Sequence, residues 1–193
     1  MDGGNAVGKQ GGSSVDLPSI LARLDSEVAS ERRAAVADVV AHVEDAPDAC
    51  LPTVPKLRSL LADDLECHTE IADCLATLAA YSPADVAPSV DEIVAFVLEN
   101  PTDDATPALV RALEAVAGDR PTALTDHVDA AAVALESDDP AARAAGARIL
   151  EHLATETETS LESMRERLTD LATDDPNASV RERAAAVLEH LER

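Results

Sequence analysis

Two Glu-His pairs are the part of this sequence that comes nearest to a catalytic or metal-binding pattern. Glu151-His152 and Glu189-His190 stand 38 positions apart, at the ends of two similar segments. On neighbouring packed helices their imidazoles would be held roughly 10 Å apart. A shared metal ion needs both imidazole nitrogens at ~2.0–2.1 Å from it, which is the usual Zn–N distance. We therefore predict that these residues hold no metal.

Other kinds of active site are also poorly represented. The chain has no Ser-His-Asp order, no glycine-rich phosphate loop and no carboxylate pair that stands out from the general acidity. With no Trp, one Tyr and one Phe, it has little with which to build the large apolar pocket that a chromophore needs. We predict a protein without catalytic residues and without a cofactor.

The cysteines favour a structural role. Cys50, Cys67 and Cys74 are odd in number, so no disulfide framework is indicated. Cys67 and Cys74 are seven positions apart with Ile71 between them, which places all three on one apolar helix face. We expect these thiols to be buried and unreactive.

The elements that must carry these side chains repeat along the chain. Residues 138–153 and 174–191 both begin with two acids and a proline, both end in Glu-His-Leu, and both place apolar residues at helical spacing. Corresponding residues recur at spacings of 35, 38, 37 and 38: Val40, Leu75, Leu113, Leu150 and Leu188. A second set recurs between them: Leu24, Leu60, Val97, Leu135 and Leu171. Proline and helix-capping residues separate the two sets, which predicts ten helices in five antiparallel pairs.

The predicted organisation is a single all-α repeat domain over residues 16–193. The five units would cover about 16–47, 48–83, 84–121, 122–157 and 158–193. Residues 1–15 hold five of the seven glycines together with Ser13 and Ser14, and they predict a disordered tail that joins no core.

The second helix of a unit carries a short motif after its acidic, proline-containing loop. The motif is Val-Arg, Ala-Ala and Leu at fixed spacing: Val180-Arg181, Ala184-Ala185 and Leu188; Ala142-Arg143, Gly146-Ala147 and Leu150; and Arg33, Ala37 and Val40. His68 and Thr106 stand in place of the arginine in units two and three. This motif resembles the short, phycobilisome-lyase-like type of HEAT repeat. The resemblance implies a right-handed α-solenoid whose second helices line a concave face.

The exposed side of the second helices is the predicted partner-binding surface. Arg111 and Arg148 lie there between acidic neighbours, and arginine makes bidentate contacts that survive partial desolvation. The full predicted site is Arg111, Arg148, Glu114, Glu151, His152, Glu189 and His190. An alternative stays open, in which this is an exposed face crossed by salt bridges worth ~0–1 kcal/mol each.

The charge balance restricts partners and setting. Asp and Glu number 38 against 15 Lys and Arg, the formal net charge is −23, and Lys9 and Lys56 are the lysines. This composition resembles the proteins of salt-accumulating haloarchaea, in which the acids are screened at ~3 Å in about 1 M salt. Such a surface repels nucleic acid. The chain also lacks a basic amphipathic helix and a long apolar run, so we expect no membrane contact and a cytoplasmic protein.

We therefore expect a protein–protein adapter in a haloarchaeal cytoplasm. Small repeat proteins of this sort in haloarchaea resemble adapters in signalling assemblies, including those that link taxis proteins to the motility motor. The alternative is an enzyme of the HEAT-like class. It would be a bilin-type lyase or a metal-dependent hydroxylase, although hydroxylases of this kind use His-Glu and the order here is Glu-His. Leu191-Glu192-Arg193 add no cap after the last core residue, so we expect a monomer or a weak end-to-end dimer.

Overall fold

A computed structural model describes residues 15–63 and 65–192, and in this part of the chain every regular element is a helix. The α-helices are α1 Leu17–Leu24, α2 Ala29–Val43, α3 Pro47–Cys50, α4 Val54–Leu60, α5 His68–Tyr81, α6 Pro83–Val86, α7 Val90–Glu99, α8 Thr106–Asp119, α9 Val128–Leu135, α10 Pro140–Glu156, α11 Arg165–Asp174 and α12 Ala178–Leu191. Short 3₁₀ turns lie at Leu51–Thr53, Ala87–Ser89, Pro121–Leu124 and Glu162–Met164.

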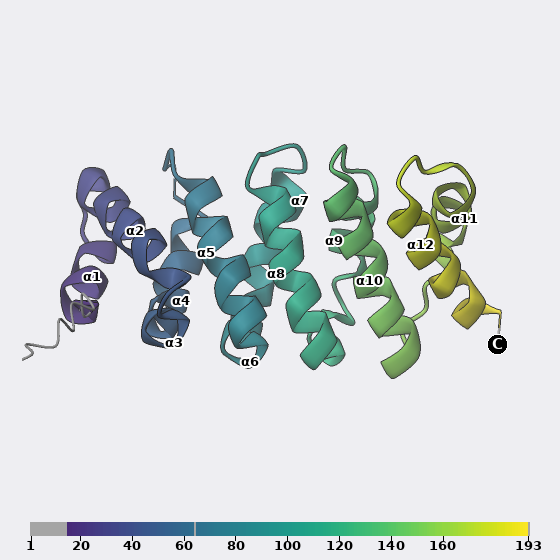
Figure 1. Cartoon of the computed structure of the whole chain (residues 1–193), viewed down its shortest axis with the longest axis horizontal. Coiled ribbons are helices and arrows are strands. Elements are labelled where there is room, and N and C mark those ends of the chain that lie inside the picture. The colour runs from purple at the N-terminus through teal and green to yellow at the C-terminus, as the bar shows by residue number, and fades with distance from the viewer. Residues whose placement is uncertain (1–14, 64, 193) are drawn as a thin grey trace, which may run out of the picture.

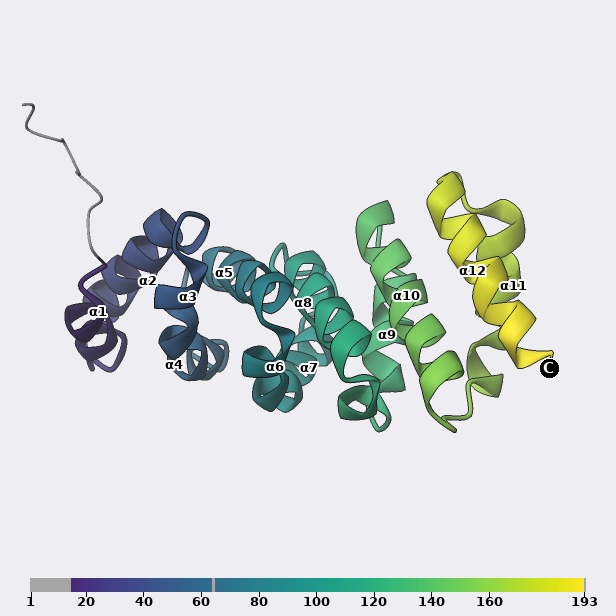
Figure 2. The ribbon, with the colours of Figure 1, turned by 60° about the horizontal axis from the view of Figure 1, so that its bottom comes forward.

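The helices form two layers in one elongated row (Figure 1). Helices α2, α5, α8, α10 and α12, here called the second helices, lie side by side in one layer, and consecutive members are in contact. Figure 2 shows the other layer beneath them, in which α1, α4, α7 and α9 contact one another in order. The protein is therefore an all-α solenoid, as the sequence predicts. The residue limits of the units stay a prediction, because helix bounds do not define repeat limits.

The predicted tail is tested at one residue. Residues 1–14 lie outside the described part of the chain. Val15, which we placed in the tail, is half-buried and packs against the core. The prediction was wrong at this position, since Val15 precedes the Asp16 cap of α1 and its apolar side chain can reach the first helix pair.

The core is one continuous aliphatic seam between the two layers. Leu75, Leu113 and Leu150 of the repeating set are fully buried, as are Leu57 and Leu135 of the other layer. Small residues allow the layers to approach closely, and Gly146 of α10 is the clearest case. A Cβ atom on Gly146 would lie 2.8 Å from the Cβ of Ala134 in α9.

Prolines bend the first-layer segment of the second and third units. Pro52 and Pro88 lie in the 3₁₀ turns that separate α3 from α4 and α6 from α7. Proline has no N–H to donate to the preceding turn, so these segments cannot continue as one straight helix. A side chain satisfies one backbone carbonyl at such a bend: the buried Thr53 hydroxyl donates to the Cys50 carbonyl at 2.7 Å.

Each second helix ties down the loop before it with one side chain near its start. These side chains donate to a carbonyl five or six residues earlier: Arg32 to Ser26 at 2.7 Å, His68 to Asp63 at 2.9 Å, Thr106 to Asn100 at 2.6 Å, Arg143 to Ser137 at 2.8 Å and Arg181 to Asp175 at 2.7 Å. The contact satisfies a carbonyl that the helix itself cannot reach. His68 and Thr106 thus replace the motif arginine in function as well as in position.

The motif assignment in the first unit was wrong by one residue. Arg32, and not Arg33, makes the loop contact and also pairs with Asp63 at 3.4 Å. Arg33 points outward and pairs with the exposed Glu66 at 3.0 Å. The two arginines are adjacent in the sequence, so spacing alone could not decide which one faces the loop.

One ion pair joins the last two units through the interior. The guanidinium of Arg143 donates to both carboxylate oxygens of Asp175, at 2.7 and 3.1 Å. Both residues are buried. The hydrogen bond from Arg143 is the main reason that the pKa of Asp175 is lowered and that of Arg143 is raised. Asp175 is therefore a structural residue, and Asn177 takes over the capping of α12 by accepting from Ser179 at 2.9 Å.

Candidate binding face

A groove runs along the layer of second helices in the first half of the row. It has a volume of about 760 Å³ and lies among α2, α5 and α8. Apolar and charged side chains share its lining, among them Val40, Val43, Glu44, Ala76, Arg111 and Glu114. Mixed lining of this kind suits a protein segment better than a small polar ligand.

Val40 is the residue that makes the groove unusual. Val39, seven residues after Arg32, is fully buried and takes the place of Leu75 and Leu150 in the other units, whereas Val40 is 42% exposed. Val40 also lines the groove together with Ala76 of the next second helix. The assignment of Val40 to the buried repeating set was therefore wrong by one residue, and Val40 is an exposed aliphatic side chain at the groove.

The two predicted arginines both lie on this layer, and each pairs with an acid of the preceding second helix. Arg111 donates to Asp73 at 3.2 Å, and Arg148 pairs with Glu114. The Arg111 and Arg148 side chains remain 48% and 42% exposed, so each pair contributes only ~0–1 kcal/mol to stability. The charges are thus matched within the protein, and Arg111 is the one of the two that lines the groove.

The remaining predicted site residues lie further along the row, away from the groove. Glu151 faces Arg183 of α12 at 3.7 Å, a partner that our sequence reasoning missed. Arg183 replaces the alanine found at the equivalent Ala108 and Ala145, and that substitution was the available signal. Glu189 is exposed on α12 and has no ion-pair partner among the described residues.

Each of the predicted histidines contacts a residue four positions away in its own helix. His190 Nδ1 lies 2.9 Å from the Ala186 carbonyl, and His152 Nδ1 lies 3.6 Å from a carboxylate oxygen of Glu156. Over residues 15–63 and 65–192, no group of three or more His, Cys, Asp or Glu side chains is arranged to hold a metal. These histidines are therefore helix-surface residues rather than members of one cluster.

The thiols and the aromatic rings contribute little to an exposed site. Cys50, Cys67 and Cys74 are buried, as predicted, and burial raises the pKa of each thiol, that of Cys74 to about 12. Phe96 is a core residue and meets the ring of His68 edge-on at 5.1 Å between centroids. Tyr81, at the end of α5, is 55% exposed.

A row of paired helices with an open groove along one layer defines the class: an α-solenoid repeat protein. No protein-family model matches the sequence, and comparison with curated proteins finds no match. Among solved structures the chain is similar to an engineered protein that was a Northeast Structural Genomics Consortium target, with a TM-score of 0.71 at 22% identity over 91% of this chain and 79% of that one. It is also similar to a computationally designed armadillo repeat protein for modular peptide recognition, with a TM-score of 0.70 at 16% identity over 90% of this chain and 81% of that one. At these identities the likeness concerns the fold.

The described part of the chain contains no helix with both the length and the apolar character needed to cross a bilayer.

Proposed function

We propose that this protein is a non-catalytic scaffold that binds a segment of another protein in the groove among α2, α5 and α8. The observation that supports the proposal is the exposed aliphatic side chain of Val40, which lines a groove of about 760 Å³. Covering an exposed aliphatic side chain stabilises a complex by about 25 cal/mol per Å². A similar solved structure is described as designed for modular peptide recognition, which is consistent with this use of the fold.

The predicted charged residues would act as the edge of this binding face. Arg111 and Glu114 line the groove, and a partner can exchange contacts with Arg111 at small cost because its pair with Asp73 is exposed and weak. We keep Arg148, Glu151, His152, Glu189 and His190 as a proposed extension of the face along α10 and α12. Recognition would then depend on shape and apolar contact, and the charged groups would fix the position of the bound segment along the face.

The finer setting that we propose is a haloarchaeal cytoplasm, and it rests on the acidic composition. An adapter in a signalling assembly, such as one that links taxis proteins to the motility motor, is proposed from the sequence resemblance alone. We also propose a monomer that associates at most weakly with a second copy.

Affinity capture in molar KCl, followed by reconstitution with the purified partner, tests the scaffold proposal. Val40→Glu places a charge in the groove and should abolish a stoichiometric complex. Leu98→Glu is the matched control, because Leu98 is also exposed, at 37%, but lies on α7 in the other layer. Equal loss with both variants would contradict the proposed groove.

Measurements on the purified protein distinguish the enzyme alternative from the scaffold proposal. Metal analysis and an absorption spectrum would reveal iron or a bilin if the protein were a hydroxylase or a lyase. Either result, in stoichiometric amount, would contradict a non-catalytic scaffold.

A further inference from the structure

A second concave surface lies on the edge of the row where the two helices of a unit are joined. A cavity of about 740 Å³ is enclosed by the turn between α7 and α8, helix α9, the turn between α9 and α10, and helix α11. A smaller cavity of about 370 Å³ adjoins it and shares Glu136, Asp138 and Arg167 with it. We call the two together the loop-edge cavity; its turns form the upper border of Figure 1. It is separate from the groove among α2, α5 and α8, with which it shares no lining residue.

Part of this cavity is apolar. Pro101 lies in the turn between α7 and α8, Pro107 is the second residue of α8, Val133 comes from α9, and Met164 precedes α11. Val133 and Met164 pack against the core but remain partly exposed. Methionine adapts its shape to different apolar partners, so this part of the cavity suits the hydrocarbon portion of an incoming side chain.

The cations that line the cavity are already used. Arg167 pairs with Glu136 at 2.7 Å and donates to the Leu135 carbonyl at 2.9 Å. Arg143, in the smaller cavity, is buried in its pair with Asp175. Each guanidinium is therefore engaged by one main carboxylate partner, and Arg143 also donates to the Asp138 carbonyl at 3.0 Å.

Four carboxylates there remain unmatched. Asp104 and Asp138 line the larger cavity, Asp138 also lines the smaller one, and Asp170 and Asp174 complete it. All four are exposed, and none makes a side-chain hydrogen bond or ion pair with another described residue. In the groove among α2, α5 and α8, Asp73 and Glu114 are each paired with an arginine, and Glu44 is the one lining carboxylate without an ion-pair partner among the described residues.

We propose that the loop-edge cavity docks a basic segment of a partner protein. Arginine side chains of the segment would pair with Asp104 and Asp138, since a guanidinium matches a carboxylate in two parallel hydrogen bonds. An apolar residue between the arginines would cover Val133 and Met164. Charge complementarity requires a positively charged partner, and the apolar lining favours a peptide over a simple cation. This surface adds a second contact to the scaffold and does not depend on the first.

The direct test uses a fluorescent peptide of about twelve residues with alternating arginine and leucine, measured by anisotropy in about 1 M KCl. At that salt concentration long-range attraction is screened beyond ~3 Å, so binding reports contacts. We expect saturable one-to-one binding of this peptide. Versions with glutamate in place of arginine, or serine in place of leucine, should each bind at least about tenfold more weakly, because each lacks one of the two required contacts. Equal binding of the three peptides would overturn the proposal.

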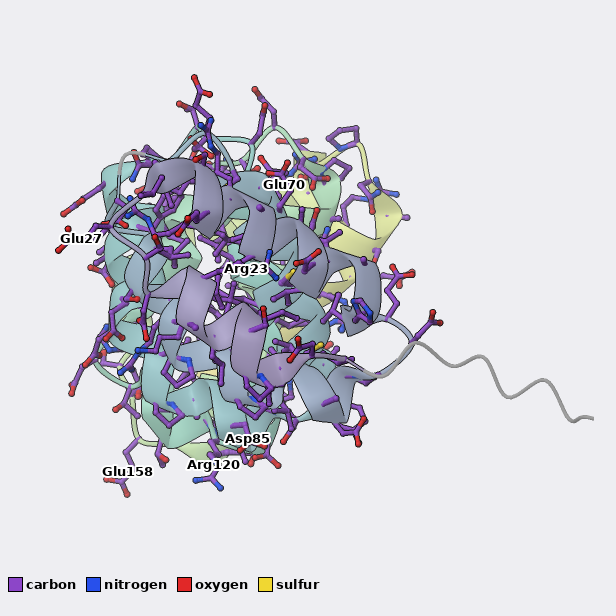
Figure 3. The ribbon with its side chains drawn as sticks, turned by 90° about the vertical axis from the view of Figure 1, so that its left-hand side faces the viewer. Arg23, Glu27, Glu70, Asp85, Arg120 and Glu158 are labelled. Atoms are coloured by element: carbon purple, nitrogen blue, oxygen red, sulfur yellow. The ribbon has the colours of Figure 1, made fainter. Side chains whose placement is uncertain are left out.

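Matched charge changes then locate the site. The double variant Asp104→Asn with Asp138→Asn should weaken binding about tenfold, as expected for two partly exposed ion pairs. The control, Glu27→Gln with Glu70→Gln, removes the same charge from the surface of the first two units, where Figure 3 shows both side chains. Equal weakening by both double variants would mean general attraction to an acidic protein, and would contradict a built site.

Two further measurements locate the bound peptide directly and show whether its binding depends on the proposed groove. A photoreactive leucine analogue in the peptide should cross-link to residues 101–107 or 132–139, and cross-links confined to α2 or α5 would overturn the proposal. The Val40→Glu variant should bind the peptide unchanged. Failure at the loop-edge cavity would thus leave the groove proposal standing, and failure at the groove would leave this one.

Discussion

At the scale of single residues, Asp175 joins a local contact to one between units. Its side chain accepts two hydrogen bonds from Arg143 of the preceding unit, and its carbonyl accepts one from Arg181 of its own second helix. Asp63 has a similar place in the second unit: its side chain forms an ion pair with Arg32 at 3.4 Å, and its carbonyl accepts a hydrogen bond from His68 at 2.9 Å. One acid in the loop thus sets both the start of a second helix and its position against the unit before.

Removing that acid should cost much more than removing a surface acid. Asp175→Ala leaves the Arg143 guanidinium buried without its counter-charge, so we expect the free energy of unfolding to fall by about 3 kcal/mol. Glu66→Ala removes the partner of Arg33 in an exposed pair and should change it by less than about 0.5 kcal/mol. Urea unfolding in high salt measures both, and similar losses would contradict the structural role of Asp175.

The same pair predicts how acid acts on the fold. The pKa of Asp175 is lowered below its ordinary value of 3.8, first of all by the hydrogen bond from Arg143. A carboxyl with a lowered pKa in the folded state stabilises that state above its ordinary pKa, and the contribution is lost as the pH falls through the folded-state value. Between pH ~7 and pH ~3 the wild type should therefore lose more stability than Asp175→Ala, as measured by thermal melting. Parallel losses would contradict a lowered pKa.

At the scale of elements, the close approach of α9 and α10 depends on a glycine. A Cβ on Gly146 would lie 2.8 Å from the Ala134 Cβ and 3.1 Å from the Ala131 carbonyl oxygen, and backbone cannot move aside cheaply. Gly146→Ala gains about 0.5–1 kcal/mol of helix propensity but costs ~1–3 kcal/mol in overpacking. We expect net destabilisation of about 1 kcal/mol in urea unfolding.

Gly118 provides the control for this substitution within the neighbouring second helix. A Cβ there would lie 3.5 Å from Nε2 of His152, which is ordinary contact. Gly118→Ala should therefore keep the propensity gain and raise the free energy of unfolding by up to about 1 kcal/mol. If both glycine variants moved stability in the same direction, helix spacing would not be set at Gly146.

Periodicity predicted the elements because both helices of a pair must bury one face, which forces the same apolar spacing in every unit. It identified Leu75, Leu113 and Leu150 as core, and it predicted an exposed second-helix side that carries Arg111 and Arg148. It placed Val40 in the buried set, and this was wrong, because the loop contact of Arg32 sets the register of the first unit and makes Val39 the buried residue. It could not choose between Arg32 and Arg33, whose roles are decided by a loop contact that spacing does not encode.

At the scale of the whole molecule, acidic side chains project around the rim of the row. Seen from its N-terminal end in Figure 3, Glu27 and Glu158 extend from the outline of the molecule, while Arg23 lies over the end face and pairs with Asp38. Most cations of the described chain are taken up in pairs of this kind, whereas the net charge is −23. The excess negative charge is therefore carried by carboxylates that face solvent.

This excess predicts that the fold depends on salt. In about 1 M KCl the Debye length is ~3 Å and the carboxylates scarcely repel one another, whereas in about 10 mM buffer it reaches ~30 Å and the whole surface is self-repelling. Alanine-rich helices that bury little area each have no large reserve of stability against that repulsion. We expect the helical circular dichroism signal and the melting temperature to fall together as KCl is removed.

A charge variant distinguishes screening from other effects of salt. Replacing Glu27, Glu70 and Glu158 by glutamine removes three exposed negative charges without touching the core. If repulsion causes the loss, this variant should keep its helical signal to lower KCl than the wild type does, while the two should be equally stable in molar salt. Sucrose, which favours burial without screening charge, should restore little. Full stability of the wild type in dilute buffer would contradict the proposed high-salt setting, and so would equal salt dependence of the two proteins.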